Sequence, residues 1–135
     1  MNVVLIAHND KNELMSQFCE AQRQVLSQHA LFATAFTANW VEKATGLQVK
    51  EFMNSEQGGY QQIAAYVAWG EVDLVVFFRN SPPSDAVDPD EVYLLYMCDK
   101  CGVPVATNIA TAELLVRAMQ NDIQGWETVL NHIHQ

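Results

Sequence analysis

Residues 71–108 read EVDLVVFFRN SPPSDAVDPD EVYLLYMCDK CGVPVATN, and this stretch decides the fold. Val72–Phe78 is a nearly unbroken run of apolar side chains, which is typical of a strand buried on both faces. Asp88 has the features of an N-cap, with proline at the first helical position, and Gly102 marks the end of the helix. A second buried strand is predicted at Val103–Ala106. A strand, a helix and a strand of these lengths form a βαβ crossover, so the two strands are expected to be parallel.

The rest of the chain continues this alternation. Apolar runs predict strands at Asn2–Ala7, Leu31–Ala35 and Leu47–Phe52. Helices are predicted to start at a capping box of Asp10 and Glu13, at the N-cap Asn39 and at Tyr60, with further helices at Thr111–Gln120 and Trp126–Ile133. Residues 1–135 are therefore predicted to form a single α/β domain, a three-layer α/β/α doubly wound sheet of five parallel strands. In such sheets the loops at the carboxyl ends of the strands build the binding site.

The composition limits the compartment and the kinds of partner. Half of the 135 residues are hydrophobic, but no apolar run approaches the ~20 residues that span a membrane. A net charge of −9 argues against a nucleic-acid partner, which needs a basic face. The first strand follows Met1 without a basic leader, and three cysteines are an odd number, so we expect a cytoplasmic protein that binds no membrane. Cys98 and Cys101 have redox-pair spacing but lie at the wrong end of their helix, which favours a structural role.

Six short segments, taken in order, resemble the methylglyoxal synthase family. They are AHN at 7–9, ATAFTA at 33–38, GGYQQIAA at 58–65, FFRN at 77–80, DPDE at 88–91 and VPVATN at 103–108. The resemblance runs nearly from end to end of the chain. It implies a sheet of strand order 3-2-1-4-5 and a homo-oligomer, usually a hexamer. It also implies conversion of dihydroxyacetone phosphate to methylglyoxal and phosphate without a metal or an organic cofactor.

The positions that carry the chemistry of this family are largely substituted here. The reaction needs a carboxylate that removes a proton next to a carbonyl group. By resemblance, that general base falls on Tyr60, whose phenol has an ordinary pKa of about 10 and is protonated at neutral pH. By the same resemblance, Asn9 and Asn80 stand where the family has two other carboxylates, and Val87 stands where it has a loop histidine. Asp90 alone matches an acidic position of the family.

A donor-rich concavity is still predicted where the strands end. Hydroxyl groups, backbone amides at a helix start and nearby cations are the groups that hold a phosphate. The predicted ligand-binding residues are His8, Lys11, Asn12, Thr34, Phe36, Thr37, Ser55, Gly58, Gly59, Tyr60 and Arg79. Lys11 is adjacent to Asn12, which replaces a lysine of the family. Arg79 either supplies charge to the ligand or pairs with Asp85 or Asp88.

Three functions follow as hypotheses. The favoured one is a methylglyoxal synthase-like protein that has lost catalysis and binds a small anionic metabolite, such as a phosphorylated one, or a protein partner in the remodelled pocket. The alternative is an active lyase, either methylglyoxal synthase itself or a related phosphate-eliminating enzyme. A third is a structural subunit that associates with an active member of the family. No metal site is predicted, because the acidic residues around Asp88 fit no EF-hand pattern.

Overall fold

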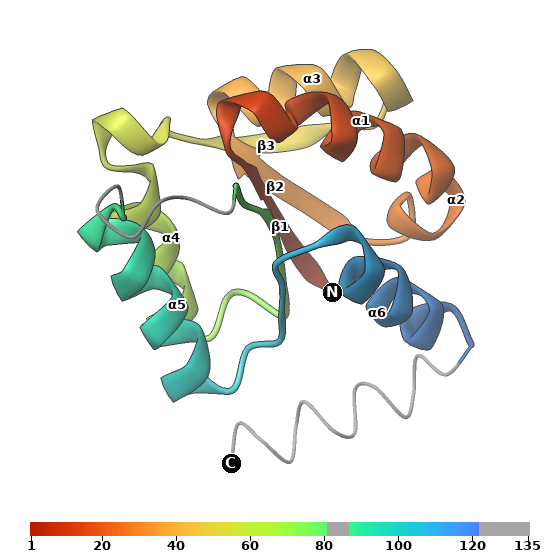
Figure 1. The fold of residues 1–135 in the computed structure, drawn as a ribbon. Helices are drawn as coiled ribbons and strands as arrows, with labels where there is room; N and C mark the ends of the chain where they lie inside the picture. Colours follow the sequence, from red (N-terminus) through yellow and green to blue (C-terminus); the bar gives the residue numbers. More distant parts are fainter. Residues whose placement is uncertain (81–86, 122–135) are drawn as a thin grey trace.

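Five parallel strands form the centre of the molecule, in the order β3-β2-β1-β4-β5 (Figure 1). The structure is a computed structural model and describes residues 1–80 and 87–121. The strands are β1 (Asn2–Ala7), β2 (Ala30–Thr34), β3 (Val49–Phe52), β4 (Leu74–Phe78) and β5 (Val105–Ala106). All four pairings between neighbouring strands are parallel, so the predicted fold and strand order are confirmed.

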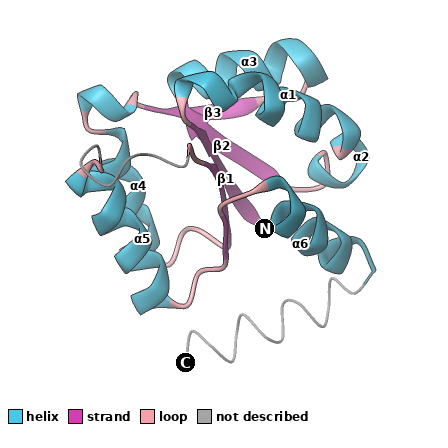
Figure 2. Ribbon diagram, viewed as in Figure 1, coloured by secondary structure: helices cyan, strands magenta, loops and turns pink. Residues whose placement is uncertain are grey.

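Alternate residues of the central strands face two separate cores. In β1, Val3 and Leu5 belong to one core, and Val4 and Ile6 belong to the other. The first face of the sheet is covered by α1 (Asn12–Ala21), α2 (Arg23–Leu26), α3 (Ala35–Thr45) and α6 (Ile109–Asn121), and the second by α4 (Gly59–Ala68) and α5 (Pro89–Cys101) (Figure 2). Because both faces are buried, the strands read as continuous apolar runs rather than as alternating patterns.

Two of the predicted helix starts are wrong. The turn after β1 is a short 3-10 helix, η1 (Asn9–Lys11), so α1 begins only at Asn12 and has no side-chain cap from Asp10. The next helix, α3, begins at Ala35 and not after Asn39, because the chain turns directly out of β2 at Thr34. This early start brings the first turn of α3 to the carboxyl end of the sheet, where a ligand would lie.

The start and end of α5 agree with the sequence. Asp88 is its N-cap, and the Asp88 Oδ1 atom accepts a hydrogen bond of 2.9 Å from the backbone N–H of Asp90. Gly102 ends the helix with a left-handed φ of 70°, a conformation that costs glycine little. Cys98 in the last turn is fully buried, and this burial raises the pKa of its thiol to about 12. A thiol of this kind is unreactive, as the structural prediction requires.

At the junction between β3 and α4, the backbone of Gly59 lies very close to the carbonyl group of Met53. A short 3-10 helix, η2 (Ser55–Gln57), leads into α4 through Gly58, which has a φ of 99°. A Cβ atom on Gly59 would lie 2.0 Å from the carbonyl oxygen of Met53. Only glycine fits at this position, so the sequence of the junction fixes how α4 leaves the sheet.

Two expectations concern the periphery of the molecule. The helix predicted at Trp126–Ile133 lies outside the described residues. Within 1–80 and 87–121, no helix has both the length and the apolar character needed to cross a membrane.

Candidate functional site

Two adjoining cavities open where the strands end. The smaller, of about 210 Å³, is lined by Ala7, Asn9, Asn12, Thr34, Phe36, Thr37, Asn54, Ser55, Glu56 and Tyr60. The larger, of about 450 Å³, is lined by Ala7, His8, Asn9, Asp10, Ser55, Tyr60, Asn80, Asp88 and Glu91. Because the two cavities share four lining residues, we treat them as one site and call it the strand-end groove. Its position at the carboxyl edge of a parallel sheet is where ligands bind in α/β folds.

Asn54 connects three elements at the upper wall of the groove. Its Oδ1 atom accepts a hydrogen bond of 2.9 Å from the backbone N–H of Phe36, at the start of α3. Its carbonyl oxygen accepts hydrogen bonds from the N–H groups of Gln57, at 2.9 Å, and Gly59, at 3.0 Å. The N–H of Gly58 in turn donates to the carbonyl of Ser55, at 3.3 Å. The amides of Phe36, Gln57, Gly58 and Gly59 are therefore already hydrogen-bonded within the protein.

Thr37 is also satisfied internally. Its hydroxyl donates a hydrogen bond of 2.7 Å to the Oδ1 atom of Asn12, and both residues are 1% exposed. The Asn12 side-chain amide donates to the carbonyl of Asn9, at 3.4 Å. Asn12, which replaces the lysine of the family, therefore joins α1 to α3 and supplies no charge to the groove.

Tyr60 lies in the floor of the groove, at the start of α4. It is 5% exposed, and its ring lies 5.5 Å from the ring of Phe77. Burial, with a smaller contribution from the nearby Glu91 carboxylate, raises the pKa of the Tyr60 phenol to about 12, and a hydrogen bond with the Ser55 side chain acts in the opposite direction. The phenol is therefore protonated throughout the physiological pH range and cannot act there as a base.

A buried carboxylate, Glu91, connects His8 and Arg79 on the other side of the groove. The Glu91 Oε2 atom lies 3.0 Å from His8 Nε2, and its Oε1 atom accepts a hydrogen bond from Arg79 Nε. His8 Nδ1 accepts a hydrogen bond of 3.0 Å from the backbone N–H of Asn80. An acceptor at Nδ1 leaves the ring proton on Nε2, so His8 donates to Glu91.

Phe77 lies beneath all of these groups. The ring of His8 packs edge-on against it at 5.5 Å, and the guanidinium carbon of Arg79 lies 5.8 Å from its centroid. Phe77 itself is fully buried in the core between the sheet and α4 and α5. His8 and Arg79, the two partners of Glu91, are thus packed on one aromatic ring, which restricts their rotamers.

Glu91 is the site residue that the sequence did not predict. Its place three residues after Asp88 suggests a capping box, but its two carboxylate oxygens bind His8 and Arg79 instead. Arg79 therefore does not pair with Asp88, and Asp85 lies outside the described residues. The sequence did show an acidic residue in the first turn of the predicted helix and an arginine directly after the preceding strand. Nothing in the residues next to Glu91 indicates that the two side chains pair.

Some of the other predicted site residues line the strand-end groove, and some do not. His8, Asn9, Asn12, Thr34, Phe36, Thr37, Ser55, Tyr60 and Asn80 line the groove. Gly58 and Gly59 shape its wall without lining it. Lys11 and Arg79 border a different cavity, with Thr107 and Asn108. Val87 is exposed, and the Asp90 Oδ1 atom accepts a hydrogen bond of 3.3 Å from Gln61, so neither lines the groove. The residues described contain no group of three or more His, Cys, Asp and Glu side chains that could hold a metal ion.

The pairing of Glu91 with Arg79 and His8 leads to a stability prediction. Replacing Glu91→Gln removes the charge that compensates Arg79, and should lower the free energy of unfolding by about 2 kcal/mol. The matched control is Asp90→Asn, which removes the same charge from the first turn of α5 but should cost no more than ~1 kcal/mol. Urea denaturation of both variants measures the difference. Equal losses in the two variants would show that the buried ion pair contributes nothing specific.

Comparison with known proteins identifies the family. Residues 15–107 match the model of the MGS-like domain. The chain is 43% identical over 131 residues to a methylglyoxal synthase of Caldicellulosiruptor saccharolyticus, covering 97% of this chain and 93% of that protein. It is 41% identical to a methylglyoxal synthase of Oceanobacillus iheyensis, covering 96% and 93%. The crystal structure of a methylglyoxal synthase from Elizabethkingia anophelis superimposes with a TM-score of 0.75 at 28% identity, covering 85% of this chain and 76% of that one. With this sheet, this strand order and these relatives, the chain belongs to the methylglyoxal synthase-like family.

Proposed function

We propose that this protein binds a small metabolite in the strand-end groove and does not convert dihydroxyacetone phosphate to methylglyoxal. The observation that carries the proposal is the burial of Tyr60, the residue that by resemblance falls at the general-base position of the family. It is a buried phenol with a pKa of about 12. Losing a positioned general base typically lowers a rate by ~10²–10⁴.

No carboxylate of the groove can readily replace that base. Glu91 is bound by Arg79 and His8, and Asp88 caps α5. Asp10 and Glu56 are exposed at the rim, where water surrounds their carboxylates. A general base must lie within hydrogen-bond reach of the proton that it removes, on the dry side of the substrate. The groove therefore keeps the shape of a binding site without the group that starts the reaction.

An active lyase is the second candidate, and one observation favours it. Relatives at 38–43% identity over nearly the whole chain carry the name methylglyoxal synthase. Activity in this chain would need a base other than Tyr60, and Glu91 is the one buried carboxylate that lines the part of the groove described here. Both of its carboxylate oxygens are already hydrogen-bonded, to His8 and Arg79.

The assay for turnover decides between these candidates. Purified protein mixed with dihydroxyacetone phosphate should release neither methylglyoxal nor phosphate above background. The Caldicellulosiruptor saccharolyticus relative, assayed in the same buffer, controls for the conditions. Turnover near the median enzyme rate of ~10 s⁻¹ would establish the lyase and reject the binding protein.

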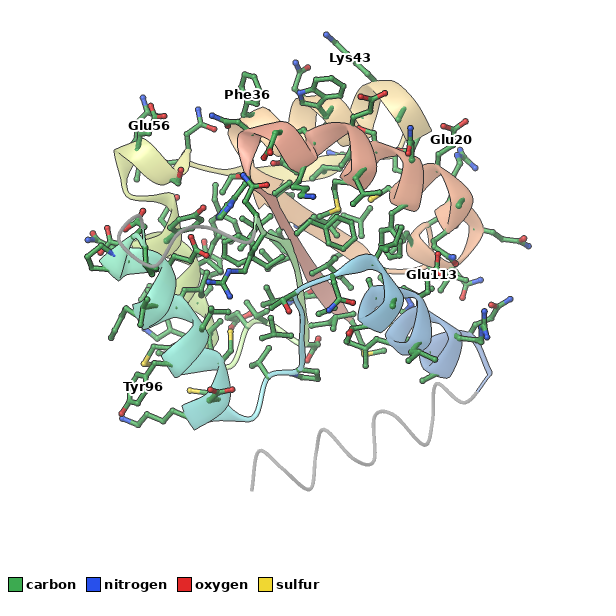
Figure 3. The ribbon with its side chains drawn as sticks, viewed as in Figure 1. Glu20, Phe36, Lys43, Glu56, Tyr96 and Glu113 are labelled. Atoms are coloured by element: carbon green, nitrogen blue, oxygen red, sulfur yellow. The ribbon has the colours of Figure 1, made fainter. Side chains whose placement is uncertain are left out.

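We also propose that the chain acts as a homo-oligomer in the cytoplasm, as the family resemblance implies. In support, α5 exposes Val92, Tyr93 and Tyr96 at 50%, 50% and 56%, and apolar side chains gathered on one helix are typical of an interface (Figure 3 labels Tyr96). The cysteines Cys19, Cys98 and Cys101 are free, as expected in a reducing compartment.

Light scattering at micromolar concentration should give a mass several times that of one chain. The double variant Tyr93→Ser/Tyr96→Ser should shift the mass toward the monomer if α5 forms the contact. A wild-type protein that elutes with the mass of a single chain would contradict the proposed assembly.

A further inference from the structure

We propose that the strand-end groove selects a small organic cation, an ammonium group attached to a compact apolar body, in place of the anion that the family pattern implies. This inference rests on the proposed function, because it names the ligand class of the same groove. Three independent features of the groove support it: its donors, its charges and its one exposed aromatic ring.

Four donors that an anion could use are occupied. The N–H groups of Phe36 and Gly59 donate to Asn54, and the N–H of Gly58 donates to Ser55. The hydroxyl of Thr37 donates to Asn12. The starts of α3 and α4 attract a negative charge mainly through free first-turn N–H groups, and these hydrogen bonds reduce their number. An anion would have to break these hydrogen bonds to use the four donors.

The charges around the groove have the opposite sign to those of a phosphate site. All seven lysine and arginine residues of the chain are in the described part, and none of them lines either cavity of the groove. Four carboxylates line it: Asp10, Glu56, Asp88 and Glu91. The Arg79 guanidinium offsets only Glu91, and neither Asp10 nor Glu56 takes part in an ion pair within the described residues. A cavity lined by one sign of charge concentrates ligands of the other sign.

An acceptor is available at the bottom of the smaller cavity. Thr34 is 5% exposed, lines the cavity and makes no side-chain hydrogen bond with the residues that the structure describes. Its hydroxyl is therefore free to accept a hydrogen bond from a ligand in the cavity. An ammonium group carries three donors and no acceptor, so it can satisfy the Thr34 hydroxyl oxygen and a carboxylate at the same time.

The rim offers an aromatic face for the rest of the ligand. Phe36 lines the smaller cavity and is 55% exposed, and Figure 3 shows it and Glu56 projecting outward from neighbouring elements. A cation held near a phenylalanine ring is attracted by the electrons of the ring face, and an apolar body buries surface against the same ring. A phosphate gains nothing from either contact.

The test uses three probes that share one phenyl ring and carry a cationic, a neutral and an anionic polar group: benzylammonium, benzyl alcohol and benzoate. Each is titrated into the full-length protein and followed by the amide NMR shifts of residues 34–37 and 54–60. We expect saturable shifts with benzylammonium, weaker ones with benzyl alcohol and none with benzoate or inorganic phosphate.

Two variants localise the cation. Glu56→Gln should raise the dissociation constant of benzylammonium about threefold, as expected for an exposed ion pair. Thr34→Val should raise it about fivefold through loss of the hydroxyl acceptor. Glu20→Gln, the same charge change at an exposed position near the far end of α1, should leave it unchanged.

Tighter binding of benzoate or phosphate than of benzylammonium would overturn the inference, and so would the absence of saturable shifts with all probes. Equal dissociation constants in wild type, Glu56→Gln and Thr34→Val would do so as well. Turnover of dihydroxyacetone phosphate is measured in a separate assay, which tests the proposed function and not the charge selectivity. If turnover is found while benzylammonium still binds in the groove, the proposed function fails and the charge selectivity stands.

Discussion

The hydrogen bonds of Asn54 are the constraint on which the site depends. One residue at the end of β3 accepts from the first turn of α3 through its side chain and from the turn before α4 through its carbonyl. Gly59 makes this possible, because any side chain there would collide with the carbonyl of Met53. The two helix starts that surround the groove are thereby fixed relative to each other. The same hydrogen bonds use the amide groups that a bound anion would otherwise need.

On the opposite side of the groove, Glu91 connects α5 to the ends of β1 and β4 by binding His8 and Arg79. It is a carboxylate buried at 5% exposure, and it is tolerated there because Arg79 and His8 both bind it and Phe77 packs against these two partners. A charge in such a place is costly unless it is paired and hydrogen-bonded. The pairing offsets the charge of Arg79. In the described residues, Asp10 and Glu56 of the groove stay without an ion pair.

The sheet could be predicted from the sequence because its signals are local. Apolar runs such as Val72–Phe78 and the Asp88 N-cap need no knowledge of distant residues. The errors lie in contacts between segments. Lys11 stands between two residues that line the groove, Asp10 and Asn12, but it borders another cavity. Glu91 binds His8, which lies 83 positions away in the sequence. Nothing in either neighbourhood specifies such a contact, because a helix residue can serve a cap or a distant partner equally well.

The proposed ligand selectivity of the groove depends on the amides of Phe36, Gly58 and Gly59 being hydrogen-bonded within the protein. Amide hydrogen exchange of the ligand-free protein, followed residue by residue with NMR, tests it most directly. The N–H groups of Phe36, Gly58 and Gly59 should exchange at least tenfold more slowly than freely solvated amides, and phosphate should neither slow them further nor shift them. If these three amides exchange as freely solvated groups and become protected when phosphate is added, the anion site is intact and the account is wrong.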